Sequence, residues 1–173
     1  MDRPPRTPQI PRRIDRNPKQ DSSRVPELAY VGSMTELSTD AVEFLSAGTR
    51  TGMLGYLASD GRPLVAPVWF VVDGHQLVFN TAAKSAKGRA LQRDPRVTLT
   101  VDDPHPPFSF VQVQGVVELS EDPDALVDLA TRIGGRYMGA DRAAEFGRRN
   151  GVPGEFIVRV TPTKVIEAFG VAD

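Results

Sequence analysis

Apolar residues between positions 52 and 80 form three short runs, which are separated by residues typical of turns. The runs are 52–58 (GMLGYLA), 63–72 (PLVAPVWFVV) and 75–80 (HQLVFN), with an Asp-Gly pair between neighbours. Asp-Gly accommodates the tight turns of β-hairpins, and β-branched and aromatic residues favour strands. The pattern therefore predicts three consecutive antiparallel strands. Pro67 cannot donate to a strand ladder, which predicts an edge or irregular position there.

Further strands are predicted in the second half of the chain. The run 96–102 (RVTLTVD) is one, and 109–119 (SFVQVQGVVEL) is another whose alternation breaks at Gly115, a position that predicts a β-bulge. The run 155–169 supplies one or two closing strands. Six or so antiparallel strands with few helices favour a mostly β fold, built as a closed or partly closed barrel.

Three stretches with helical spacing interrupt the strands. They cover 37–48, 85–94 and 122–139. Each opens with a side chain that can cap a helix, namely Ser38, Ser85 and Asp122. The sequence therefore predicts three helices, the last of which buries a stripe of Leu126, Leu129, Ala130, Ile133 and Tyr137.

Composition narrows the class of protein. The 173 residues are 40% hydrophobic, which suits one domain with a real core. The chain has no cysteine, which rules out disulfides, thiolate metal sites and cysteine nucleophiles and fits a cytoplasmic protein. No apolar run approaches the roughly 20 residues of a membrane span, and the N-terminus lacks an apolar signal core. A formal net charge of −1 argues against nucleic acid as a partner.

Residues 1–34 differ from the rest. They hold six of the 15 prolines and seven basic against four acidic side chains. Such a segment has little to bury, so we expect a disordered tail ahead of one domain at 35–173. Two alternatives stay open: a basic arm for anionic surfaces, or sequence upstream of the true start, since Met34 opens a sensible N-terminus.

Cations gather in residues 81–97 (TAAKSAKGRALQRDPRV), where a predicted strand ends at Asn80 and a helix begins after Ser85. A helix start offers free amide N–H groups and a positive dipole end, which favour an anion. Thr81 adds a hydroxyl, and basic side chains follow at Lys84, Lys87 and Arg89. The segment is a candidate phosphate site, although a short exposed helix with solvated cations would have the same sequence.

Three segments together resemble the pyridoxamine-phosphate-oxidase-like flavin and deazaflavin family, in particular its actinobacterial branch that uses coenzyme F-420. The segments are 61–70 (GRPLVAPVWF), 81–97 and Val-x-Val-x-Gly at 111–115, and the resemblance covers 35–167. It implies a six-stranded antiparallel split β-barrel that forms a homodimer with cofactor sites along the interface. The C-terminal ending TPTKVIEAFGVAD departs from the Arg-Leu-x-Pro-like ending of the vitamin oxidase, which argues against pyridoxamine phosphate oxidation.

The resemblance also implies which residues bind the cofactor. The ring would rest on Ala66, Pro67, Val68 and Trp69, and the phosphate would meet Thr81, Ser85, Ala86, Lys87 and Arg89. Asn80 and Lys84 would be further cofactor-binding residues. Val101 and Asp102 would lie close to the pocket, as would the partner's stretch near Phe108 and Phe110. A glutamate tail would have Arg136, Tyr137, Arg148 and Arg149 as looser candidates.

Three functions fit these residues. The first is an F-420-dependent reductase of an unsaturated small molecule, the second an FMN-dependent oxidoreductase on the same fold, and the third a non-catalytic cofactor carrier. Hydride transfer needs neither a metal nor a protein nucleophile, so we assign no catalytic residue. We expect His75 to be a solvated turn residue and His105 to lie in a rigid exposed loop.

Overall fold

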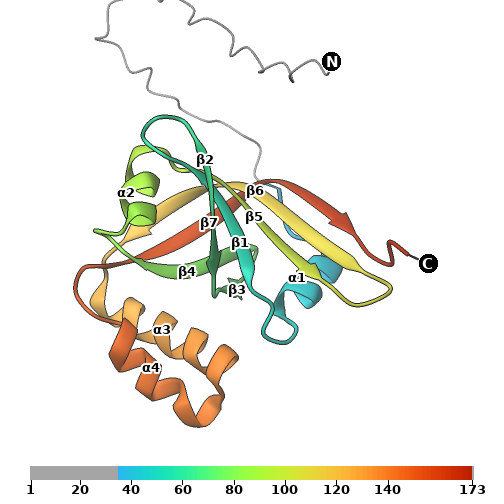
Figure 1. Cartoon of the computed structure of the whole chain (residues 1–173). Helices are drawn as coiled ribbons and strands as arrows, with labels where there is room; N and C mark the ends of the chain where they lie inside the picture. The colour runs from blue at the N-terminus through green and yellow to red at the C-terminus, as the bar shows by residue number, and fades with distance from the viewer. Residues whose placement is uncertain (1–34, 173) are drawn as a thin grey trace, which may run out of the picture. The chain divides into compact units, whose positions relative to one another are not determined.

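The computed structural model describes residues 35–172 (Figure 1). The tail expected at 1–34 lies outside the described residues. Seven strands form one antiparallel sheet in the order β2-β1-β5-β6-β7-β4-β3. Their bounds are β1 Gly52–Leu57, β2 Pro63–Val68, β3 Val71–Asp73, β4 Gln76–Ala82, β5 Arg96–Asp103, β6 Ser109–Ser120 and β7 Glu155–Ala168. The prediction of a mostly β, antiparallel fold is confirmed.

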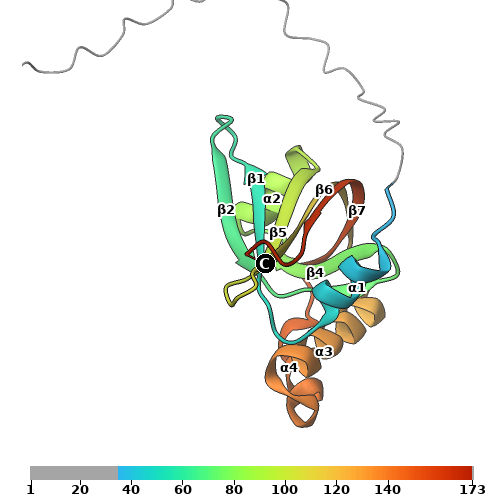
Figure 2. The same ribbon diagram turned by 90° about the vertical axis from the view of Figure 1, so that its right-hand side faces the viewer.

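The first and last strands of the sheet, β2 and β3, are neighbours in the chain. Only Trp69 and Phe70 separate them, so this dipeptide joins the two edges of the sheet, and the strands curl round into a barrel (Figure 2). The prediction of one continuous strand at 63–72 was wrong at this point, which is why seven strands are present where six were expected. With β2 and β3 counted as one broken strand, the structure is the expected six-stranded split barrel.

The predicted helices begin at the expected caps. Helix α1 covers Thr39–Ser46, α2 covers Ala86–Arg93 and α3 covers Pro123–Met138, and the cap side chains accept amide hydrogen bonds from Ala41, Gly88 and Ala125 respectively. The sequence analysis missed the short helix η1 (Ala140–Arg142) and helix α4 (Ala143–Asn150). Helices α3 and α4 lie side by side outside the barrel in both views (Figures 1 and 2).

Two apolar clusters hold these elements together. The larger lies inside the barrel and includes Leu54, Phe70, Phe79, Leu99 and Val113, together with α1 residues such as Leu45. The smaller one packs the stripe of α3 against the outer side of β3, β4 and β7. None of the helices within residues 35–172 is both long enough and apolar enough to cross a membrane.

The irregularity predicted at Gly115 is present. The register of β6 on β7 shifts between Gln114, which pairs with Lys164, and Gly115, which pairs with Pro162. The extra residue is therefore Thr163 on β7. Gly115 is needed for close approach, since a Cβ there would lie 2.6 Å from the Thr161 carbonyl oxygen.

Candidate functional site

The start of α2 is built from the end of β4 and the turn that follows it. Ser85 is the N-cap, and its hydroxyl oxygen accepts a hydrogen bond from the Gly88 amide at 2.9 Å. Thr81, which is 6% exposed, places its Oγ1 3.5 Å from the Ser85 Oγ. The structure thus brings together the hydroxyls of Thr81 and Ser85 and the first amide N–H groups of a helix, which have no intrahelical partner.

Gly88 lets this helix start pack tightly on the turn. A Cβ at Gly88 would lie 2.3 Å from the Ala82 carbonyl oxygen and 2.8 Å from that of Ala83. The Ala83 amide in turn donates to the Gly154 carbonyl at 2.9 Å. The absence of a side chain at Gly88 therefore makes room for the protein's own backbone.

Most cations of the 81–97 segment are engaged by the protein. Arg96 forms an ion pair with Asp94 at 2.6 Å. Arg93 donates to the Arg89 carbonyl at 3.0 Å, and Arg89 donates to the Lys84 carbonyl. Lys84, Ala86 and Arg89 are exposed around the helix start.

Lys87 differs from its neighbours because its side chain is partly buried. Its ammonium lies over the Phe79 ring, 5.7 Å from the centroid. Burial lowers the pKa of Lys87, and the negative charge of Glu155 opposes that shift. The Lys87 Nζ makes no ion pair or hydrogen bond within residues 35–172. In that range every fully buried polar side-chain atom has a partner, so the Lys87 Nζ is not fully buried and can be reached from solvent. An anion that binds there would contact a cation that is only partly hydrated.

Glu155 is a member of this site that sequence reasoning did not identify. It opens β7 and pairs in register with Ala82, the last residue of β4. Its Oε2 accepts a hydrogen bond from the Asn80 amide nitrogen at 3.1 Å. Asn80 was expected to bind a cofactor, and the structure places its side chain on this carboxylate. Only the pairing of β4 with β7 brings the two together, so no local signal could have found Glu155.

The residues expected to hold the cofactor ring lie on the edge strand β2 and just after it, not at the start of α2. Strand β2 is at the edge of the sheet, as Pro67 predicted, and among the described residues it pairs only with β1. Pro67 is exposed, Ala66 is half-buried and Val68 is buried. Trp69 is 40% exposed, and its ring stacks on Tyr137 with centroids 4.8 Å apart and planes within 4°. Trp69 thus follows the edge strand as an aromatic surface backed by α3.

Strand register shows how these groups relate. Gly52, the first residue of β1, pairs with Val68. At the other end of β1, the Leu57 carbonyl lies 3.5 Å from the Arg93 guanidinium of α2. Within one chain, the expected ring residues and the α2 helix therefore lie toward opposite ends of β1.

Arg136 and Tyr137 are occupied by structural contacts. Arg136 donates to the carbonyls of Leu45, Gly48 and Phe70 at 2.6, 3.0 and 2.8 Å, and burial lowers its pKa. The Tyr137 hydroxyl donates to the Arg50 carbonyl at 2.8 Å and accepts from the Phe70 amide at 3.3 Å. Arg148 and Arg149 are exposed on α4, where Arg149 lies over the Phe146 ring.

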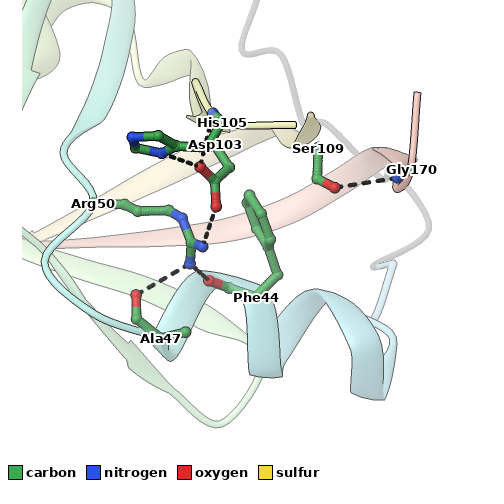
Figure 3. Close-up of polar contacts among 7 residues, drawn as sticks. All are labelled: Phe44, Ala47, Arg50, Asp103, His105, Ser109 and Gly170. Atoms are coloured by element: carbon green, nitrogen blue, oxygen red, sulfur yellow. Dashed lines mark hydrogen bonds and ion pairs between the residues drawn. The ribbon is translucent and has the colours of Figure 1, made fainter. Parts of the chain in front are cut away.

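The end of β5 carries a charged cluster around Asp103. Val101 is fully buried and Asp102 is exposed. Asp103 contacts Arg50 at 2.6 Å and His105 Nδ1 at 2.9 Å (Figure 3). The hydrogen bond from Arg50, followed by those from His105, lowers the pKa of Asp103 to about 2. His105 is exposed, as expected, in the loop between β5 and β6.

Comparison with known proteins gives a consistent picture. The family model described as pyridoxamine 5'-phosphate oxidase matches residues 38–168. An F420 reductase of known structure is 30% identical, with a TM-score of 0.57 over 72% of this chain and 94% of that one. A conserved hypothetical protein from Mycobacterium tuberculosis is 25% identical, with a TM-score of 0.68 over 79% and 87%. The heme storage protein HutZ from Vibrio cholerae shares the fold at 16% identity, with a TM-score of 0.61 over 80% and 100%. No curated protein matches the chain.

Proposed function

This chain belongs to the pyridoxamine 5'-phosphate oxidase family, and from that premise we propose that it is an oxidoreductase that uses coenzyme F-420. When bound, the coenzyme supplies a hydride for an unsaturated small molecule. Similarity to an F420 reductase at 30% identity supports this cofactor. The observation that carries the proposal is Lys87 at the start of α2, a partly buried cation that has no bonded partner within residues 35–172.

The residues at the start of α2 have the donors and the positive charge that a phosphate group requires. The helix start supplies amide N–H donors and a positive dipole end, Thr81 and Ser85 supply hydroxyls, and Lys87 supplies charge. Lys84 and Arg89 add exposed positive charge around this position. FMN carries a phosphate too, so the same residues support FMN as the alternative cofactor.

The residues proposed to position the cofactor ring lie at the Gly52 end of β1. The last turn of α2 contacts Leu57 at one end of β1, whereas Val68, beside the expected ring residues, pairs with Gly52 at the other end. Ala66, Pro67 and Trp69 line the edge strand at the far end from α2. We propose that a second copy of the chain covers this edge and completes the pocket. The cysteine-free composition agrees with a cytoplasmic location.

A charge-removing substitution tests the phosphate site. Lys87→Met keeps an unbranched stem over the Phe79 ring and removes the ammonium. A charge-assisted contact to phosphate contributes about 1.5–3 kcal/mol. The variant should therefore bind F-420 about ten- to a hundredfold more weakly. Turnover at saturating F-420 should change much less, because binding of the phosphate is uniform along the reaction. Fluorescence titration measures the affinity.

Arg93→Met is the matched control, because Arg93 lies in the last turn of α2 and bonds backbone carbonyls there. It should leave the affinity for F-420 within about twofold of the parent. The proposal fails if the parent binds neither F-420 nor FMN, and the phosphate assignment fails if Lys87→Met binds as tightly as the parent.

A further inference from the structure

Glu155 is a carboxylate held beside the proposed phosphate site. Its position is set by the ladder between β4 and β7, in which Glu155 lies opposite Ala82. Its orientation is set by the hydrogen bond that its Oε2 accepts from Asn80 at 3.1 Å. Both partners belong to the strand that leads into the start of α2. The carboxylate is therefore a fixed part of this region and is only partly exposed.

The charge of Glu155 acts on the same cation that is proposed to bind phosphate. It opposes the effect of burial on the pKa of Lys87, although no ion pair joins the two side chains at 4 Å or less among the described contacts. Lys87 is thus left free to contact a ligand, while a negative charge remains close by. Any anion that binds Lys87 is attracted by the ammonium and repelled by Glu155.

We infer that Glu155 is a specificity-determining residue that shifts the preference of the phosphate site toward a singly charged phosphodiester and away from a doubly charged phosphomonoester. The inference rests on the proposed function and names the class of phosphate group that Glu155 disfavours at that site. The phosphate of F-420 is a diester with one negative charge. FMN is a monoester, whose charge is about −1.5 to −2 at pH 7.

The size of the effect follows from the charge of each ligand. Coulomb energy is proportional to the product of the charges, so a fixed carboxylate repels a dianion twice as strongly as a monoanion at the same place. Removal of the Glu155 charge should strengthen binding of both cofactors. Because affinity depends exponentially on energy, the gain for FMN should approach the square of the gain for F-420.

Glu155→Gln tests this inference, because the amide oxygen of Gln can still accept the Asn80 hydrogen bond. We expect affinity gains of about threefold for F-420 and about tenfold for FMN at pH 8 and low salt. Riboflavin, which has the ring but no phosphate, should bind the variant and the parent equally. Fluorescence titration of the three compounds gives the ratios, and a thermal melt verifies that the variant is folded.

Two further variants serve as controls. Glu43→Gln removes the same charge from α1, which lies on the other side of the barrel from α2 (Figure 1), and it should leave the FMN to F-420 affinity ratio unchanged. Glu155→Asp keeps the charge and should keep the parent's ratio. Equal gains for FMN and F-420 in Glu155→Gln, or no gain for either, would overturn the specificity role while leaving the proposed function intact. A parent protein that binds neither cofactor would overturn both.

Discussion

Burial of the Lys87 ammonium removes part of its hydration, and no bonded partner within residues 35–172 restores it. The lowered pKa means that the folded state holds this proton less tightly than the unfolded state does. At neutral pH the charge of Lys87 therefore opposes folding. A residue that costs stability in the free protein but binds the ligand is typical of a functional site.

Because the charge of Lys87 opposes folding, Lys87→Met should stabilise the fold even though it weakens binding of the cofactor. Lys87→Met should raise the melting temperature of the cofactor-free protein at pH 7 slightly, by no more than about 4 °C, because the ammonium is only partly buried and solvent screens part of the effect. The parent's disadvantage should shrink as pH rises through the lowered pKa toward about 10.4, because the folded state then carries Lys87 neutral. Thermal melts of both proteins from pH 7 to pH 10 measure the difference. A variant less stable than the parent at pH 7 would contradict this account of Lys87.

Whether a residue of the candidate site could be predicted from the sequence depends on how far along the chain its contact partners lie. Ser85 and Lys87 were predictable, because a cap and a basic first turn follow each other within three residues. Glu155 was not, because its partner Asn80 lies 75 residues away and only strand pairing joins them. The structural role of Arg136 was missed for the same reason, since its acceptors are carbonyls on α1 and at the β2–β3 junction.

At the scale of elements, the local sequence pattern predicted the helices that begin with a capping side chain and the strands that are flanked by turn residues. It did not predict the break at Trp69 and Phe70, because both residues continue an apolar run. The contacts made at the break come from α3, where Tyr137 accepts from the Phe70 amide and Arg136 donates to its carbonyl. Helix α4 was missed because it buries only Phe146 and Gly147, against α3.

The packing of α2 on its preceding turn leads to a prediction for one glycine. Gly88→Ala should destabilise the fold by about 1–3 kcal/mol, the usual cost of overpacking, since backbone oxygens must move to admit the Cβ. It should also weaken F-420 binding, because the helix start must shift. Gly135→Ala is the control: its Cβ would meet the Ala143 Cβ at an ordinary 3.4 Å, so it should be neutral or stabilising by up to about 1 kcal/mol. Urea unfolding compares the two, and equal stabilities would contradict the packing argument.

At the scale of residues 35–172 as a whole, the barrel leaves an apolar surface on its edge hairpin. Met53 is 47% exposed and Val65 is 69% exposed on the same side of β1 and β2, next to Pro67. Trp69 follows at the end of the edge strand. Contiguous apolar surface of this kind marks an interaction site in many proteins. An edge strand that is left unpaired is also open to association, which a covering subunit prevents.

We therefore expect a homodimer that buries this hairpin and shares its cofactor sites between the two chains. Val65→Glu places a charge at the centre of the exposed surface, where burial without a partner is costly. It should shift the mass measured by light scattering from twice the 18.8 kDa chain to a single chain. Affinity for F-420 should fall with it, by about tenfold or more, if a second chain completes the pocket. Val127→Glu, on the 41% exposed Val127 of α3, should remain dimeric and bind as the parent does. A parent that binds F-420 as a monomer would contradict the dimeric site.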